Sequence, residues 1–181
     1  MTFARRRQHG FSLTEMLVMI FLAGLIIAIS VPLTVHTIRA NRLNGAARTV
    51  LGDIRLAQSM AATRAGIHAW QWGPDAGRPE SQSRVVRDAG DCVLPDPQAP
   101  QDGTEVVRKW FDVGQSYDGV TIASVRDDQD RPLGGVMFNA LGASMNTCVP
   151  SVSFPIHVTL IDGRGNTRVV LVKSAGGTSL Q

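Results

Sequence analysis

A single carboxylate, that of Glu15, lies at the start of a long apolar stretch. Residues 16–38 contain no Asp, Glu, Lys or Arg. A charged side chain inside a bilayer costs about 2.5–3.5 kcal/mol on insertion scales, so such a residue usually has a partner. If the chain is cut between Gly10 and Phe11, the new α-amino group lies one helical turn before Glu15, on the same face. These residue types therefore indicate charge neutralisation between Glu15 and an N-terminal ammonium, its own or that of a neighbouring subunit.

No arrangement of residues indicates catalysis. The four histidines are scattered, and neither a His-x-x-x-His nor a Cys-x-x-Cys spacing occurs. Asp127, Asp128 and Asp130 lie close together in the sequence, and close carboxylates can hold Ca²⁺. A later Glu is missing from this loop and Arg131-Pro132 interrupts it, so a solvated turn is the favoured interpretation. We expect no enzymatic activity, no cofactor and no metal.

The apolar stretch has the length of a membrane-spanning helix. Roughly 20 apolar residues cross a bilayer, and Met16–Val35 supplies that length. Three arginines at positions 5–7 precede it, which predicts a cytoplasmic N-terminus and an outward-facing remainder. One alternative is a cleaved secretory signal with a mature start at Val31. Another is an uncleaved membrane anchor. Neither alternative has a use for Glu15.

The leader and the first helix together resemble a known family. The sequence "RRRQHG" followed by "FSLTEMLVMIFLAGLIIAISVP" closely resembles the class III leader of type IV pilins and type II secretion pseudopilins. The resemblance implies that a membrane-embedded prepilin peptidase cuts after Gly10 and that Phe11 becomes N-methylated. It implies that Glu15 guides the subunit into a growing fibre. The implied partners are other pilins or pseudopilins, an inner-membrane assembly platform and membrane lipid.

The apolar stretch continues into an amphipathic segment. Residues at spacings of three and four form one apolar stripe, namely Leu43, Ala47, Val50, Ile54, Ala57 and Ala61. We predict one long helix from Ser12 to Ala65, with Gly66 as its C-cap. Most of the arginines at positions 39, 42, 48, 55 and 64 lie off the stripe. They could bind phospholipid headgroups or DNA, but a solvated helix face is the favoured interpretation.

The remainder of the chain has the pattern of β-strands. Candidate strands lie at residues 67–72, 83–88, 105–111, 119–124 and 135–139. The clearest hairpin is predicted over residues 155–174, where apolar residues alternate on both sides of "DGRGN". One N-terminal helix followed by many strands predicts an α+β fold, with the helix packed on an antiparallel sheet. This order also fits the pilin superfamily.

The predicted domains are a leader at 1–10, a transmembrane helix at 11–38, an amphipathic stem helix at 39–65 and a periplasmic β-rich head at 66–181. The first 65 residues hold eight arginines against two carboxylates, whereas the head has a net charge of −3. If the head lies outside the cytoplasm, a disulfide between Cys92 and Cys148 is favoured over two unpaired buried thiols. Trp70 and Trp72 share a strand face, which predicts packing rather than a stacking platform for bases.

The head most resembles the GspH/FimT group of minor pilins. The resemblance is carried by "LGDIRLAQSMAATRAGIHA", "VMFNALGAS" and "GRGNTRVVLVKSAGG". It implies a minor pilin or pseudopilin at or near the tip of a type II secretion pseudopilus or a type IV pilus. The alternative is a DNA-binding minor pilin of natural transformation. The tail after Lys173 has no basic residue, so Arg164, Arg168 and Lys173 are the remaining candidates for nucleic-acid contact.

Overall fold

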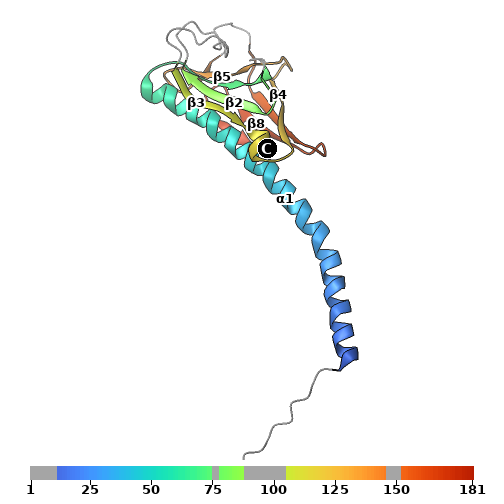
Figure 1. Cartoon of the computed structure of the whole chain (residues 1–181). Helices are drawn as coiled ribbons and strands as arrows, with labels where there is room; N and C mark the ends of the chain where they lie inside the picture. Colours follow the sequence, from blue (N-terminus) through green and yellow to red (C-terminus); the bar gives the residue numbers. More distant parts are fainter. Residues whose placement is uncertain (1–11, 75–77, 88–104, 146–151) are drawn as a thin grey trace, which may run out of the picture. The chain divides into compact units, whose positions relative to one another are not determined.

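The structure is a computed structural model that describes residues 12–74, 78–87, 105–145 and 152–181, and within α1 the side chains of residues 30–36 are not described (Figure 1). The predicted processing residues Gly10 and Phe11 lie outside the described residues, as do Cys92 and Cys148. The chain divides into two compact units, residues 1–39 and residues 40–181, which are treated separately below.

Helix α1 (Leu13–Arg64) is 52 residues long and continuous through Pro32. Its first turn forms on Ser12, whose carbonyl accepts the N–H groups of Glu15 and Met16 at 3.0 and 3.1 Å. The predicted bounds are confirmed to within one residue at each end. The predicted cap is shifted by one position. Ala65, with φ of 48°, is the left-handed residue, and Gly66 follows it and donates its N–H to the Ala61 carbonyl.

In the second unit, the apolar stripe of α1 is buried. All six predicted residues of the stripe, from Leu43 to Ala61, are at most 3% exposed, and Ala46 joins them. Four of these seven residues are alanine, and their small side chains allow strands to approach the helix closely. Figure 1 shows this half of α1, in teal, running alongside the strands. The spacing of apolar residues therefore predicted the buried face of the stem correctly.

In the part of the head that the structure describes, the strands form two antiparallel sheets. The strands are β1 (His68–Trp72), β2 (Gln82–Arg87), β3 (Glu105–Asp112), β4 (Val120–Arg126), β5 (Gly135–Phe138), β6 (Ser144–Met145), β7 (Ile156–Asp162), β8 (Thr167–Val172) and β9 (Thr178–Leu180). One sheet has the order β3-β2-β1-β5-β6 and the other has the order β4-β7-β8-β9. The α+β prediction is confirmed, but the single sheet that the sequence suggested is replaced by two.

The predicted strands are all present with small shifts of their ends. The β7–β8 hairpin pairs Ile156 with Val172 and Ile161 with Thr167, as its alternating pattern indicated. The elements that the sequence did not reveal are short. They are the helix α2 (Val113–Ser116), β6 and β9, which have two to four residues each. Segments of this length carry too few residues to display a period, so only the tertiary fold defines them.

Both sheets and α1 share one hydrophobic core. Trp70 and Phe138 from one sheet and Leu160 from the other are fully buried in the same cluster as Ile54 of α1. Trp72 packs against this cluster and its Nε1 donates to the Glu80 carbonyl at 3.0 Å. The prediction that Trp70 and Trp72 pack on one face is therefore confirmed.

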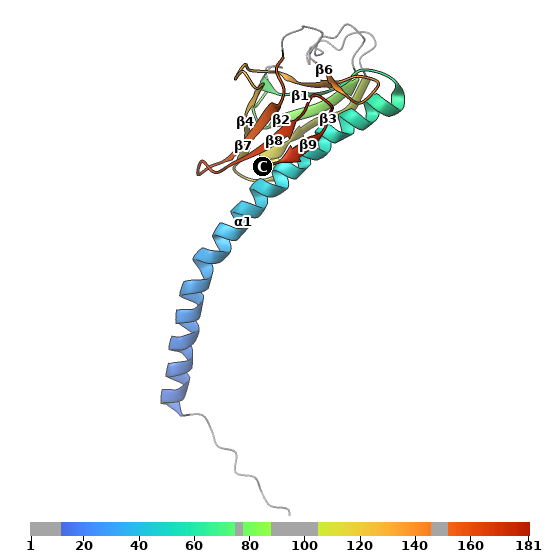
Figure 2. The same cartoon turned by 180° about the vertical axis from the view of Figure 1, so that it is seen from behind.

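Polar contacts on both flanks of α1 join it to the two sheets. On one flank, Asp53 forms an ion pair with Arg108 of β3. On the other flank, Arg55 donates to the hydroxyl of Thr178 in β9 at 2.9 Å, and Figure 2 shows β9 beside the helix. Asp53 is only 2% exposed, and its Oδ2 has no hydrogen-bond partner among the described residues. The Arg108 guanidinium therefore compensates a buried negative charge.

We predict that Arg108→Met lowers the free energy of unfolding by about 3 kcal/mol, because it leaves the Asp53 carboxylate buried without a partner. Chemical denaturation of the fragment that begins at Arg39 measures this change. Adding Asp53→Leu to Arg108→Met should restore most of the stability, since an apolar pair replaces the ionic one. Arg87→Met is the matched control, because Arg87 lies 4.0 Å from the half-exposed Glu105. This substitution should lower the free energy of unfolding by less than about 1 kcal/mol. If Arg108→Met lowers the free energy of unfolding no more than Arg87→Met does, then Arg108 does not compensate the charge of Asp53.

Candidate functional site

Glu15 lies in the first turn of α1, and its side chain is exposed. The N-terminal end of a helix carries a partial positive charge, which favours a carboxylate at this place. Ser12 and Thr14 beside it share a hydrogen bond between their hydroxyls at 2.7 Å. Helical geometry is described from Leu13 onward. The predicted pairing of Glu15 with the amino group of Phe11 therefore stays a prediction.

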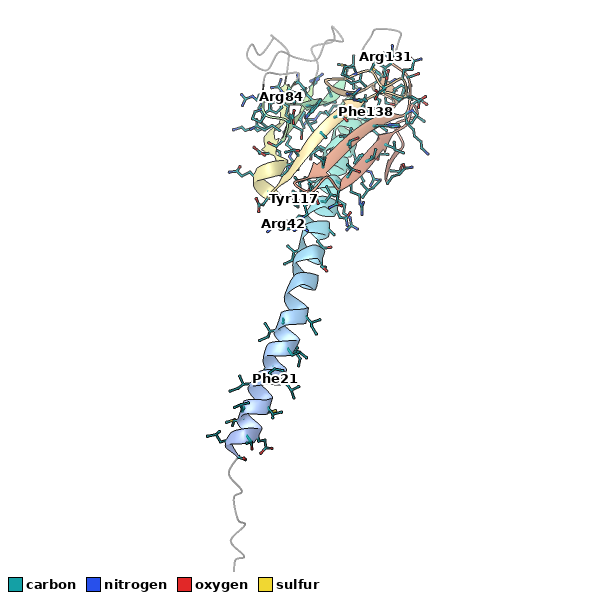
Figure 3. All side chains as sticks on the ribbon, turned by 90° about the vertical axis from the view of Figure 1, so that its right-hand side faces the viewer. Phe21, Arg42, Arg84, Tyr117, Arg131 and Phe138 are labelled. Atoms are coloured by element: carbon teal, nitrogen blue, oxygen red, sulfur yellow. The ribbon has the colours of Figure 1, made fainter. Side chains whose placement is uncertain are left out.

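The helix around Glu15 is apolar and uncovered. The large apolar side chains between Leu13 and Ile29 are 48–82% exposed, and they occupy successive positions rather than one stripe. Figure 3 shows Phe21 among these side chains, which project from the helix in all directions. A helix that is apolar all round is normally found in an apolar environment. In the part of the chain that is described, no helix reaches the combination of length and hydropathy that defines a candidate membrane span.

Three of the five stem arginines are engaged with the head. Arg42 pairs with Asp118 at 3.0 Å, Arg64 pairs with Glu105 at 3.0 Å, and Arg55 contacts Thr178. All three side chains remain exposed, as the prediction of a solvated face requires, but each also contacts the head. Their partners come from the turn before β4, the start of β3 and Thr178 of β9. Sequence spacing alone contains no signal for these contacts.

The candidates for nucleic-acid contact are not gathered in one place. Arg164 lies in the turn of the β7–β8 hairpin and is exposed. Arg168 lies at the start of β8 and donates from Nε to the Asn44 side chain at 2.8 Å. Lys173 follows the other end of β8, where its carbonyl accepts the Ser144 hydroxyl at 2.6 Å. Two of the three candidates thus lie near the beginning of the stem, and the third lies a strand length away.

Lys173 lines a different feature of the head. It borders a pocket of about 300 Å³ together with Phe154, Pro155, Leu171 and Ser174. The pocket is open and mainly apolar, and it contains no arrangement of acids, bases or nucleophiles that could support a reaction. It therefore adds no catalytic site to the expectations from sequence.

Trp110 has surroundings that sequence reasoning missed. The guanidinium carbons of Arg84 and Arg78 lie 4.7 and 5.2 Å from the centre of its ring. Arg84 is almost buried and also donates to the side chain of Gln71 at 2.8 Å. This stack lies on the opposite face of its sheet from the main core. The sequence does not predict this stack, because its residues are far apart in the chain and come together only when β2 pairs with β3.

The aspartate-rich loop after β4 is organised as a turn. Asp127 is buried, and its Oδ1 accepts the N–H groups of Gln129 and Arg131 at 3.0 and 2.8 Å. Its Oδ2 accepts from the Arg131 guanidinium at 2.7 Å and from the N–H of Ser153 at 3.3 Å. These donors occupy the oxygens that a calcium ion would need. Among the described residues, no group of three His, Cys, Asp or Glu could hold a metal ion.

Two opposing effects act on the pKa of Asp127. Burial alone would raise the pKa, but the N–H groups of Arg131 and Ser153 and the Arg131 guanidinium stabilise the charged form more strongly. The pKa is therefore held below its ordinary value. A carboxylate with a lowered pKa in the folded state stabilises the fold above its ordinary pKa of about 3.9, and that contribution disappears as the pH falls through the lowered value.

We predict that Asp127→Asn lowers the thermal midpoint at pH 7 and that the difference from the parent shrinks as the pH falls below about 4. Thermal unfolding followed by circular dichroism across a pH series measures it. Asp128→Asn is the matched control, since this neighbouring carboxylate is exposed. An equal effect of the two substitutions at pH 7, or a difference that persists in acid, would show that the charge of Asp127 has no special role.

Comparisons with known proteins add two findings. The family model for the prokaryotic N-terminal methylation motif matches residues 5–31. The crystal structure of the type IV minor pilin FimU from Pseudomonas aeruginosa superposes with a TM-score of 0.52 and 17% identity, over 78% of this chain and 90% of that chain. The minor pseudopilin EpsH from the type 2 secretion system of Vibrio cholerae gives a TM-score of 0.49 and 9% identity, over 77% and 96%.

A comparison with curated protein sequences gave no significant match. The methylation motif lies on the leader and first helix that contain Gly10, Phe11 and Glu15. The likeness to FimU concerns the fold, in which a long N-terminal helix is packed on an antiparallel head. The chain thus combines a match to the prokaryotic N-terminal methylation motif with a fold similar to that of a type IV minor pilin.

Proposed function

We propose that this protein is a minor pilin or pseudopilin, a structural subunit of the GspH/FimT type in a type IV pilus or a type II secretion pseudopilus. The observation that carries the proposal is the exposed apolar half of α1 with Glu15 in its first turn. The large apolar side chains from Leu13 to Ile29 are exposed all round this part of the helix, so it requires lipid or the helices of other subunits around it.

The proposed sequence of events begins in the inner membrane. Residues 11–38 anchor the chain there, with the leader 1–10 in the cytoplasm and the stem and head, residues 39–181, in the periplasm. Prepilin peptidase removes the leader after Gly10, and Phe11 becomes N-methylated. The assembly platform then moves the subunit into a fibre of other pilins. In that fibre, the carboxylate of Glu15 neutralises a terminal ammonium within an apolar bundle of helices.

The protein performs no reaction in this proposal. Its activity is assembly, with the head as the surface that neighbouring subunits or cargo contact. Among the described residues, two buried carboxylates are engaged in structural contacts: Asp53 of the stem pairs with Arg108, and Asp127 of the head accepts hydrogen bonds within its turn. Cys92 and Cys148 are proposed to form a disulfide in the oxidising periplasm.

Two measurements on the native protein test this proposal. Mass spectrometry should find a mature chain that begins with N-methylated Phe11. A start at Val31 would indicate ordinary secretion, and a retained Met1 or leader would indicate an uncleaved anchor; either result would reject the proposal.

We further predict that Glu15→Gln lowers incorporation into fibres about a hundredfold, because an ammonium left unpaired in the apolar bundle costs about 2.5–3.5 kcal/mol. The measurement is the fraction of subunit in sheared fibres by quantitative immunoblot. Thr14→Val is the matched control at the adjacent position and should assemble as the parent does. Equal incorporation of Glu15→Gln and Thr14→Val would mean that the carboxylate is not used in assembly.

The second candidate function is DNA binding by the head during natural transformation. The observation that favours it is the closeness of Arg164 and Arg168, in and beside one hairpin turn. Against it, Lys173 lies at the other end of β8 and the head as a whole is acidic. A gel-shift titration with a DNA duplex over a salt series tests this function. Binding that weakens steeply with salt, and that is lost in Arg164→Gln, would favour it over assembly alone.

A further inference from the structure

The face of the second sheet that is turned away from the core carries an apolar side chain. In β8, Val170 and Val172 are fully buried in the core, so Leu171 between them lies on the opposite face, where it is only partly buried. Leu171 pairs with His157 of β7 and with Ser179 of β9, and Figure 2 shows these three strands side by side. An interior strand of the sheet therefore presents an apolar group on the outer face of the head.

The pocket of about 300 Å³ described above lies beside Leu171. Its described lining has an apolar part, Phe154, Pro155 and Leu171, and a polar part, Lys173 and Ser174. We call it the Lys173 pocket, because Lys173 is the single charged residue of the described lining. An apolar cavity of about 150 Å³ accommodates benzene, so the Lys173 pocket has room for one large apolar side chain.

Contacts within the head hold the lining in place. Phe154 packs against the shared hydrophobic core. The Ser144 hydroxyl donates to the Lys173 carbonyl at 2.6 Å and lies 3.0 Å from the Ser174 carbonyl oxygen. The Lys173 N–H in turn donates to the Gly177 carbonyl at 2.8 Å. Because the backbone here is already fixed, a ligand of the pocket has little further ordering to impose on it.

The donors of the polar lining are unused among the described residues. The Lys173 ammonium forms no ion pair or hydrogen bond there, and the N–H and hydroxyl of the exposed Ser174 donate to no acceptor. The Asp127 carboxylate accepts from Ser153, next to Phe154, but its charge is paired with Arg131. An ammonium, an N–H and a hydroxyl together match the two oxygens of a carboxylate.

We propose that the Lys173 pocket receives a segment of a neighbouring subunit in which a large apolar side chain is adjacent to an Asp or Glu. The apolar side chain contacts Phe154, Pro155 and Leu171, and the carboxylate binds Lys173 and Ser174. The inference rests on the proposed assembly into a fibre, which supplies the neighbour. It assigns one contact surface of the head and the chemistry of the partner that this surface selects.

A protein segment fits the Lys173 pocket better than a free small molecule does. Small-molecule sites have volumes of about 300–1,000 Å³ and bury most of the surface of their ligand. The Lys173 pocket is at the lower limit of that range and is open, so a free ligand would keep much of its surface in water. A side chain that belongs to a protein segment gains additional contacts from the sheet face around the pocket. Nucleic acid requires several basic residues, and the described lining has one.

The test uses the full-length chain in detergent micelles with the peptide acetyl-Gly-Phe-Glu-Gly-amide and its Phe-Gln and Ala-Glu analogues. The nuclear magnetic resonance signals of the Leu171 and Lys173 amides report occupancy of the pocket. We expect millimolar binding of the Phe-Glu peptide. The Phe-Gln peptide should bind about threefold more weakly, because an ion pair with an exposed lysine contributes modestly. The Ala-Glu peptide should bind at least about tenfold more weakly, because its side chain leaves the apolar part unfilled.

Lys173→Gln should bind the Phe-Glu and Phe-Gln peptides equally, since it removes the charge that distinguishes them, and Lys173→Arg should keep the preference. Lys109→Gln is the matched control and should also keep the preference, because Lys109 is exposed on β3 of the other sheet. Equal binding of both peptides by the parent, or no signal change at about 10 mM peptide, would overturn the proposal. Stronger binding of hydrocinnamate, a free small carboxylate, or of a DNA duplex would overturn the assignment to a protein segment.

Photo-cross-linking in cells that assemble the fibre identifies the neighbour. With p-benzoylphenylalanine at position 174, the cross-linked peptide should belong to another subunit and contain a large apolar residue next to Asp or Glu. Lys173→Gln should lower the yield, and Lys109→Gln should not. A peptide from a second copy of this chain, or one without such a residue pair, would overturn the proposal. If the parent enters fibres but no subunit is cross-linked, only the pocket assignment fails; if the parent is absent from fibres, the proposed function fails as well.

Discussion

One continuous helix must satisfy two different environments, and the rest of the structure depends on this constraint. From Leu43 to Ala61, α1 buries one stripe of small apolar side chains against the head. From Leu13 to Ile29, it exposes large apolar side chains on all sides. The first arrangement is that of a helix in a globular protein, and the second is that of a helix surrounded by lipid or by other helices. The core of the head is therefore formed, whereas the large apolar side chains from Leu13 to Ile29 remain exposed.

The stem helix is also the element that joins the two sheets. Its core face packs with side chains from both sheets, and its flanks carry polar contacts to β3 on one side and β9 on the other. Because residues of α1 lie in the one cluster that both sheets share, removing the helix would expose buried side chains of each sheet. This arrangement explains why a short strand such as β9 is held in place, since Thr178 binds Arg55 and Leu180 pairs with Val170.

Charge is distributed unevenly around the stem, and the distribution follows from packing. On the flank that faces β3, the charged residues Asp53 and Arg64 find partners in Arg108 and Glu105. At the beginning of the stem, Arg168 donates to two neutral groups, the Asn44 side chain and the Thr167 carbonyl, and Arg48 and Arg164 are exposed. The average charge of the head, which is negative, hides this local excess of positive charge. The local surface charge of this protein therefore depends on which segments lie side by side, and the average composition does not predict it.

Local pattern was sufficient for much of the protein. The spacing of apolar residues in the stem predicted the bounds and the buried face of α1, because a helix of this length repeats its period many times. Alternation in "PIHVTLIDGRGNTRVVLVKS" predicted the β7–β8 hairpin for the same reason. The motif around Gly10, Phe11 and Glu15 is a property of consecutive residues, so the sequence alone sufficed to recognise it, while its use in assembly stays a proposal.

Tertiary structure decided everything that depends on residues far apart in the chain. It divided the strands into two sheets, since the order in which strands pair is a global property that no local period contains. It placed the left-handed residue at Ala65, one position before the predicted Gly66. It brought Arg168 to Asn44 across 124 positions and left Lys173 at the other end of its strand. The sequence by itself determined the long helix, the longer strands and the N-terminal methylation motif, and the packing of those elements determined which charges meet.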